Sequence, residues 1–162
     1  MKTHDNLMAS FAGESQANRK YTAFAAVAEQ EGHKEIAKLF LAAAEAENIH
    51  ATGELKLAGK LGDTTANLKA AIEGETYEFT TMYPDFEKDA VSEDNKQALR
   101  IFGFAKEAEK VHAKLYKEAL DNIANESGAS YYLCPVCGYI EKDGVPDMCP
   151  ICKAKGTNFK KY

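Results

Sequence analysis

The sequence predicts a mainly α protein, a four-helix bundle followed by a small C-terminal metal-binding domain. Three observations support this fold class. Up to about residue 125 the chain is rich in Ala, Glu, Lys and Leu at helical spacing, and glycines and turn residues divide it into four segments. The motif Glu-x-x-His occurs twice within these segments. All four cysteines come later, between Cys134 and Cys152, together with three of the four prolines.

Four helices account for the first part of the chain. We expect the first over about residues 5–30 and the second over about 34–57. The third begins near Thr65 and carries Pro84 late in its length, where a proline should kink or end it. Ser92 is the expected N-cap of the fourth, which continues to about Asn122.

The composition changes after "NESGAS" at 125–130, which indicates a domain boundary. We expect one domain over residues 1–126 and a second over residues 131–162. The second is too short to be stabilised by core burial alone, so a bound metal is expected to hold it together.

The overall charge and the N-terminus limit the function classes. A net charge of −5 without a basic cluster argues against nucleic acid or an anionic membrane as the main partner. The first residues lack the apolar core of a signal peptide, and no apolar run is long enough to span a membrane. We therefore expect a cytoplasmic protein, in which clustered cysteines indicate a metal site rather than disulfides. The C-terminal lysines are expected to be solvated, with docking to an acidic partner as the alternative.

The Glu-x-x-His motif belongs to an internal repeat. "LFLAAAEAENIHA" at 39–51 and "IFGFAKEAEKVHA" at 101–113 align without gaps, with seven identities in thirteen positions. A spacing of three places Glu47 and His50 on one helix face, and Glu109 and His112 likewise. A single copy on a helix is usually solvated, but two copies on alternate helices point to a shared purpose.

The other two helices carry a weaker match. "FAGES" at 11–15 aligns with "IEGET" at 72–76, which pairs Glu14 with Glu75. Burying several carboxylates without cations would cost several kcal/mol each. One Glu from each of two helices plus Glu-x-x-His from each of the other two is the ligand set of ferritin-like carboxylate-bridged bundles. Mixed carboxylate and imidazole ligation suits two ions of iron or manganese.

The repeat is broken at one informative position. Glu78 follows Glu75 by three residues, whereas its counterpart in the first half is Ala17. The predicted site therefore holds five carboxylates and two imidazoles. The extra carboxylate would make the two metals unequal or would change partner with oxidation state.

The cysteines form two Cys-x-x-Cys pairs, "CPVC" and "CPIC", separated by eleven residues. This spacing strongly predicts one tetrahedral four-thiolate site, with the ligands Cys134, Cys137, Cys149 and Cys152. Spacing alone does not separate iron from zinc. A redox-active metal site in the same chain favours iron, because a one-electron carrier would then have an acceptor.

Together, "AGESQANRKY", "EAENIH", "GETYEFTTMYP", "EAEKVH" and "CPVCGY…CPIC" resemble the rubrerythrin family over essentially the whole chain. The resemblance implies a ferritin-like di-iron four-helix bundle followed by a rubredoxin-like domain that holds one iron between its four cysteines. It implies seven ligands of the two irons: Glu14, Glu47, His50, Glu75, Glu78, Glu109 and His112. Glu47 and Glu109 would bridge the metals, and Glu78 would exchange with a histidine as the oxidation state changes. Tyr21 and Tyr83 match tyrosines that line the family's site, although ordinary packing would explain them almost as well.

The activity implied by the resemblance is a peroxidase acting in oxidative stress defence. Hydrogen peroxide would be reduced to water by electrons from a donor such as rubredoxin or an NAD(P)H-dependent reductase, delivered through the iron of the four-cysteine site. A homodimer is expected, as is common in the family. The main alternative is a ferritin-like ferroxidase that binds and stores iron. A third reading is a structural metal protein whose tail is a zinc ribbon.

Overall fold

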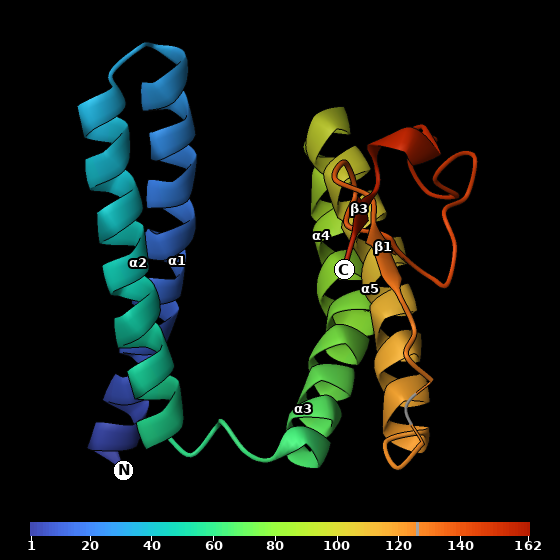
Figure 1. Ribbon diagram of the computed structural model, residues 1–162, viewed down its shortest axis with the longest axis horizontal. Helices are drawn as coiled ribbons and strands as arrows, with labels where there is room; N and C mark the ends of the chain where they lie inside the picture. Colours follow the sequence, from blue (N-terminus) through green and yellow to red (C-terminus); the bar gives the residue numbers. More distant parts are fainter. Residues whose placement is uncertain (126) are drawn as a thin grey trace. The chain divides into compact units, whose positions relative to one another are not determined.

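The computed structural model describes residues 1–125 and 127–162, so residue 126, where the first domain is predicted to end, lies outside the described residues. The chain consists of two compact units, Met1–Gly62 and Asp63–Tyr162. Each unit is described by itself below. Figure 1 shows their elements in sequence colours.

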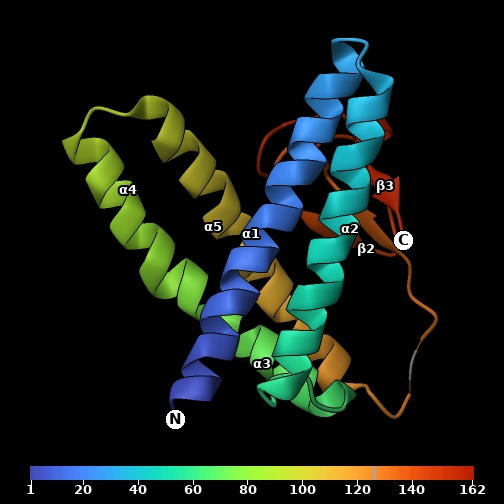
Figure 2. The ribbon, with the colours of Figure 1, turned by 90° about the vertical axis from the view of Figure 1, so that its left-hand side faces the viewer.

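The N-terminal unit is a helical hairpin. Helices α1 (Lys2–Gln30) and α2 (Lys34–Leu57) lie side by side, as both ribbon views show (Figures 1 and 2). Gly32, with a φ of +85°, turns the chain between them. These bounds confirm the first two predicted helices to within a few residues.

Only small side chains are buried in this hairpin: Ala25, Ala28, Ala37, Ala44 and Ala51. Asn18 Nδ2 donates a hydrogen bond of 2.7 Å to the Ala44 carbonyl across the seam between the helices. The larger apolar residues stay outside the seam, and Leu39 and Ile49 remain 69% and 64% exposed. A pair of helices with an alanine core buries little apolar area, so the hairpin is not expected to be stable without further helices.

The third predicted helix continues past Pro84, which was expected to kink or end it, and changes its winding before the proline. Helix α3 (Thr64–Tyr77) starts at Asp63, whose side chain accepts a hydrogen bond of 2.7 Å from Ala66 N. It continues through a π-helical turn, η1 (Glu78–Met82), into α4 (Tyr83–Ser92). Pro84 lies in the first turn of α4, where its missing N–H costs little. The helical segment α3–η1–α4 therefore continues through the proline, because the wider π-helical turn before it accommodates the ring.

The prediction that Ser92 caps the next helix is wrong. Ser92 is the last residue of α4, and its Oγ donates to the Asp89 carbonyl. Helix α5 (Lys96–Asp121) begins instead after Asn95, whose side chain accepts a hydrogen bond of 3.0 Å from Ala98 N. Both residues are good N-caps, and the left-handed Asp94 (φ +50°) makes the turn that selects the later one.

The remaining residues form a small module on the C-terminal unit. We call residues 131–162 the cysteine module. It contains a three-stranded antiparallel sheet of order β2-β1-β3, made of β1 (Tyr131–Leu133), β2 (Ile140–Lys142) and β3 (Lys160–Lys161), and a short 3-10 turn, η2 (Gly156–Asn158). Its core is Cys134, Tyr139 and Cys149, against which Val111 of α5 packs.

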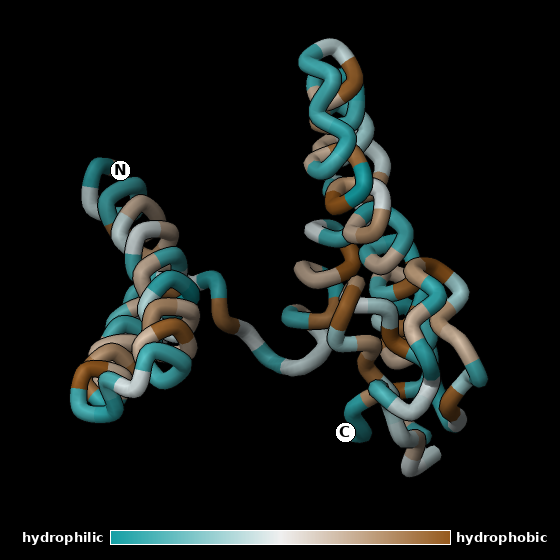
Figure 3. The backbone as a smooth tube through the Cα atoms, turned by 90° about the horizontal axis from the view of Figure 1, so that it is seen from above, coloured by the Kyte–Doolittle hydropathy of each residue, from teal (hydrophilic) through white to brown (hydrophobic). Residues whose placement is uncertain are grey.

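Apolar and polar stretches alternate along the helical tubes, as amphipathic helices require (Figure 3). Within the part of the chain that the structure describes, no helix is both long enough and apolar enough to cross a membrane.

Candidate metal centres

A glutamate of α1 and the Glu-x-x-His motif of α2 form the first group of metal ligands. Glu14, Glu47 and His50 each offer one ligand atom, and these atoms lie within 4.8 Å of one another. We call them the N-terminal triad. His50 Nδ1 lies 3.0 Å from Glu47 Oε2, as expected for residues three apart on a helix. A hydrogen bond with Glu47 raises the pKa of Glu14, because the two carboxyl groups are held close together.

The second group has the same composition and lies on α3 and α5. Glu75, Glu109 and His112 also place one ligand atom each within 4.8 Å of the others. We call them the C-terminal triad. His112 Nδ1 is 2.6 Å from Glu109 Oε2 and 3.6 Å from Glu75 Oε2. The three side chains are only 16–20% exposed, so Glu109 does not point into bulk water.

The pKa values and hydrogen bonds of the C-terminal triad indicate that it lacks a cation. Burial, and then a hydrogen bond with Glu109, raise the pKa of Glu75 to about 8. A hydrogen bond from His112 lowers the pKa of Glu109, although burial opposes this. Glu75 Oε2 is buried and has no hydrogen-bond partner among the residues that the structure describes. A cation would replace the proton on Glu75 and satisfy this oxygen, so the residues fit a metal ion.

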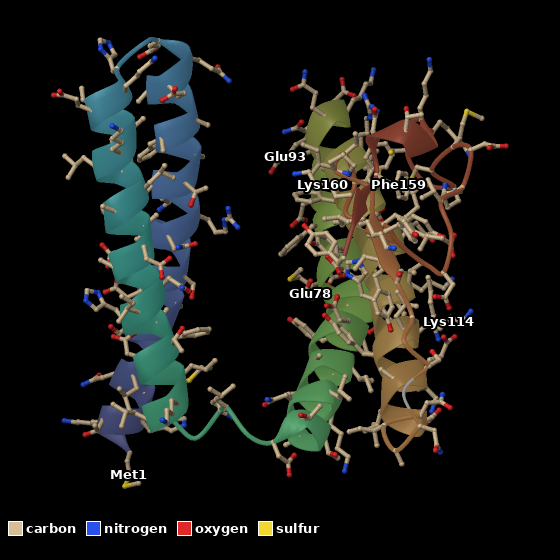
Figure 4. The ribbon with its side chains drawn as sticks, in the orientation of Figure 1. Met1, Glu78, Glu93, Lys114, Phe159 and Lys160 are labelled. Carbon is tan, nitrogen blue, oxygen red and sulfur yellow. The ribbon has the colours of Figure 1, made fainter. Side chains whose placement is uncertain are left out.

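Glu78 and Tyr83 lie near the C-terminal triad. Glu78 opens the π-helical turn, midway along the α3–α4 rod (Figure 4). Burial raises its pKa, the charge of Glu109 adds to this, and His112 opposes it. Burial also raises the pKa of Tyr83, followed by the charges of Glu78, Glu109 and Glu75. Glu78 is outside the group of atoms within 4.8 Å, so the structure places it beside the triad rather than in it.

Tyr21 has different surroundings. Its ring lies 6.2 Å from the rings of Phe24 and Phe40, in an aromatic cluster between α1 and α2. Contacts of this kind are those of a packing residue. Its role at a metal site stays a prediction.

Two further residues belong with the triads and are absent from the sequence motifs. Ser10 Oγ donates a hydrogen bond to Glu54, whose Oε2 is buried without a partner among the described residues, and whose charge contributes to the raised pKa of Glu14. Burial, then the charges of Glu75 and Glu109, raise the pKa of Tyr116. Glu54 and Tyr116 each follow the glutamate of a Glu-x-x-His motif by seven residues, which is two helical turns. This spacing is the signal by which they could have been found.

The cysteines of the module converge as predicted. One sulfur from each of the four lies within 4.8 Å of the others. Cys134 Sγ is 3.6 Å from Cys152 Sγ, and Cys137 Sγ is 3.5 Å from Cys149 Sγ. A tetrahedral site with metal–sulfur bonds of about 2.3 Å has sulfur–sulfur edges of about 3.8 Å. The four thiols are therefore close to the geometry that a metal ion requires.

The two cysteine pairs have matching backbone geometry. Gly138 N donates to the Cys134 carbonyl and Lys153 N to the Cys149 carbonyl, each over 3.1 Å. Gly138 and Lys153 both have positive φ, at +82° and +63°. Such turns aim amide groups at the sulfurs: burial alone would raise the pKa of Cys134, but the amides of Val136 and Cys137 lower it overall.

Comparison with known proteins shows the family to which the chain belongs. A family model described as rubrerythrin matches residues 5–120, and one described as the rubredoxin-like domain of rubrerythrin matches residues 132–160. The chain belongs to the rubrerythrin family. Nigerythrin of Nitratidesulfovibrio vulgaris is 40% identical over 174 residues, which cover 99% of this chain and 86% of that protein. Rubrerythrin of the same organism is 33% identical over 178 residues, covering 98% and 93%.

Solved structures of relatives agree with this assignment. Nigerythrin in its fully reduced, all-ferrous state matches with a TM-score of 0.62 and 38% identity, over 99% of this chain and 86% of that one. Partially reduced nigerythrin also gives a TM-score of 0.62, with 39% identity. The rubrerythrin fold predicted from the sequence, ferritin-like with a rubredoxin-like C-terminal domain, is confirmed. As a rubrerythrin, the chain is a di-iron protein with a rubredoxin-like four-cysteine iron site.

Proposed function

We propose that this rubrerythrin is a non-haem di-iron peroxidase that reduces hydrogen peroxide to water. The observation that supports it best is the packing of the cysteine module on α5, the helix that carries Glu109 and His112. A one-electron thiolate site packed on the helix of a carboxylate–histidine site suits repeated reduction of the second site by the first. Iron storage has no need of such an arrangement.

Both triads are proposed to supply ligands to one di-iron centre. Glu47 and Glu109 would bridge the metals, Glu14, Glu75 and the two histidines would each bind one of them, and Glu78 would be the carboxylate that changes partner. The structure shows each triad inside its own unit, and the convergence of all seven side chains stays a prediction.

When bound, the two irons supply Lewis acidity and the two electrons that cleave the O–O bond, so that one hydrogen peroxide and two protons give two waters. The protein must supply and hold those protons. Glu78 has a raised pKa and can carry one to the site. Tyr83, kept protonated by its raised pKa, can donate a hydrogen bond toward the oxygen on which negative charge develops.

The external reductant would meet the cysteine module. Cys137 and Cys152 are partly exposed, whereas Cys134 and Cys149 are buried, so an electron donor can approach one side of the four-thiolate site. We propose rubredoxin or an NAD(P)H-dependent reductase as donor, a homodimer as assembly and the cytoplasm as location.

Anaerobic mixing of the reduced, iron-loaded protein with hydrogen peroxide tests the proposal. We expect rapid oxidation with one peroxide consumed for each two electrons, followed by turnover when a reductant is added. The Cys152→Ser variant, which loses the four-thiolate site, should give the first oxidation without efficient turnover. Oxygen-driven loading of many irons per chain without peroxide turnover would instead identify a ferroxidase.

A further inference from the structure

An apolar cavity of about 440 Å³ lies between α5, Leu68 of α3 and the cysteine module. Its helix wall consists of residues at spacings of three, one and three, which share one side of α5: His112, Leu115, Tyr116 and Ala119. Its other wall is one face of the sheet, because Tyr131 and Leu133 are two residues apart on β1 and Ile140 of β2 is paired with Leu133. The cavity is therefore built from regular secondary structure of the C-terminal unit.

Contacts outside the cavity hold its walls in place. Tyr131 N donates a hydrogen bond of 3.1 Å to the Tyr162 carbonyl, and Tyr162 N donates one of 2.8 Å to the Tyr131 carbonyl. Val111, which precedes His112 on α5, packs against the core of the module. Tyr162 also lines the cavity and is 72% exposed, so the cavity opens to solvent beside this residue. A small molecule can therefore enter a site that is already formed.

Two lining residues connect the cavity to the C-terminal triad. His112 belongs to the triad, and both of its ring nitrogens are engaged: Nδ1 is 2.6 Å from Glu109, and Nε2 donates to the Gly138 carbonyl over 2.8 Å. Its ring therefore offers the cavity an apolar face. Burial, and then the charges of Glu75 and Glu109, raise the pKa of Tyr116, so its phenol lies near the triad and stays protonated. The Tyr116 hydroxyl has no hydrogen-bond partner among the residues that the structure describes, so it can donate to a ligand.

The size and lining of the cavity exceed what hydrogen peroxide needs. Two oxygen atoms of water size occupy about 60 Å³, a small part of the 440 Å³ present. The leucine and isoleucine side chains offer no hydrogen bonds, and cavities lined in this way bind apolar molecules in preference to water. The volume falls within the range of small-molecule sites, roughly 300–1,000 Å³. The cavity therefore fits the apolar group of an organic molecule.

We infer that this cavity binds the apolar group of an organic hydroperoxide, with the two peroxide oxygens directed toward Tyr116 and the C-terminal triad. Because His112 belongs to both the cavity and the triad, one molecule can occupy the first and present its oxygens to the second. This inference rests on the proposed function and widens its substrate class. The hydroperoxide ROOH takes up two electrons and two protons, its O–O bond breaks, and the products are the alcohol ROH and water. The electrons come from the same external donor that serves hydrogen peroxide.

Binding of 2-phenyl-2-propanol, the alcohol formed from cumene hydroperoxide, tests the site without any reaction. The full-length protein is loaded with zinc, and its methyl NMR signals are followed as the alcohol is added. We expect saturable shifts at the cavity residues Leu68, Leu115, Leu133 and Ile140. Leu39, which is 69% exposed on α2, is the reference and should not shift. Absence of shifts at the four cavity residues overturns the inference.

The substitution Ala119→Leu should fill part of the cavity. Lys110→Leu is the matched control, because it places the same side chain at an exposed position of α5. One methylene group in an apolar pocket changes specificity by about 10–200-fold. We therefore expect Ala119→Leu to weaken binding of the alcohol by at least about tenfold. The ratio of kcat/KM for cumene hydroperoxide to kcat/KM for hydrogen peroxide should fall by a similar factor, and Lys110→Leu should keep the wild-type values of both.

Equal binding and an equal ratio for the two variants, with circular dichroism showing both to be folded, overturn the inference. If Ala119→Leu does not fold, binding of the alcohol to the wild type decides. If the cavity signals of the wild type shift with protein concentration and not with the alcohol, a second copy fills the cavity and the inference fails.

The two measurements separate this inference from the proposed function. If the wild type reduces hydrogen peroxide but neither binds the alcohol nor reduces cumene hydroperoxide, the inference fails and the proposed function stands. If the wild type binds the alcohol in the cavity but reduces neither peroxide, the peroxidase proposal fails and the ligand class assigned to the cavity stands.

Discussion

Glu75 of α3 and Glu109 of α5 share a hydrogen bond between their carboxyl groups, and His112 Nδ1 faces both of them, 2.6 Å from Glu109 and 3.6 Å from Glu75. Ionising both carboxyl groups at this separation costs free energy, because the two negative charges repel each other. Here one of the two groups is ionised and the other is protonated. Glu109 stays ionised because His112 donates to it, while the pKa of Glu75 rises to about 8. The pair therefore holds a proton at neutral pH when no metal is bound.

The metal-free protein should become less stable as pH rises from about 4.5 to about 8. Glu75 releases its proton near 4.5 when unfolded and near 8 when folded, so the folded state binds more protons in this window. The stability contributed by the protonated carboxyl is complete below 4.5 and lost as pH passes 8. Melting curves across this range check the prediction, with a change of about 2–4 °C for each kcal/mol. Glu75→Gln, which cannot ionise, should flatten the dependence; an unchanged slope would contradict the assignment.

Tyr83→Phe should slow peroxide reduction by about tenfold, the size of one hydrogen bond of about 1.4 kcal/mol to developing charge. The phenol lies near Glu78 and Glu109 and stays protonated, so removal of its O–H removes a donor without changing the ring packing against Phe86 and Phe102. Steady-state kinetics measure the effect. Tyr77→Phe is the control, because Tyr77 is 58% exposed on the same rod. Equal rates for the two variants would leave Tyr83 a packing residue.

Gly156→Ala should destabilise the cysteine module. An added Cβ would lie 1.9 Å from the Pro146 carbonyl oxygen, which is backbone and cannot move aside cheaply. We expect at least about 1–3 kcal/mol of destabilisation, visible as a lost or shifted thiolate absorption band and a lower melting temperature. Gly144→Ala is the matched control, because its Cβ would meet nothing within 4 Å. A normal thiolate spectrum for Gly156→Ala would show that the loop can rearrange.

Asn95→Ala should destabilise the protein by about 1 kcal/mol through loss of the N-cap of α5. Ser92→Ala should have a smaller effect, because the Ser92 hydroxyl donates to the Asp89 carbonyl at the exposed end of α4 and caps no helix. Chemical denaturation of both variants compares them directly. A larger loss for Ser92→Ala would restore the earlier helix start.

The parts of the fold that depend on local spacing could be predicted from the sequence. Glu47 and His50 meet because three residues make almost one helical turn, and the repeat transfers this to Glu109 and His112. The cysteines of each Cys-x-x-Cys pair are brought together by a tight turn rather than by a helix, closed by hydrogen bonds from Gly138 N to the Cys134 carbonyl and from Lys153 N to the Cys149 carbonyl.

The sequence does not predict the parts of the fold that depend on competition between neighbouring residues or on tertiary contacts. Ser92 and Asn95 are equally good caps, and the turn at Asp94 decides between them. Pro84 signals a disturbance but not its form, which is the π-helical turn before it. No sequence motif predicts that the cysteine module packs on Ala108 and Val111, because this contact joins side chains far apart in the chain.

The buried alanines between α1 and α2 set the distance between the two helices, and with it the distance between the ligands of the N-terminal triad. Glu14 lies on α1 and Glu47 on α2. Their carboxylates can bind a common ion only because the small alanine side chains between the two helices let the backbones approach closely. A larger side chain in place of one of these alanines, such as Ala44, would move α1 and α2 apart. The triad would then favour a larger ion or bind none. The smallest side chains in the hairpin thus decide which cations its carboxylates can hold.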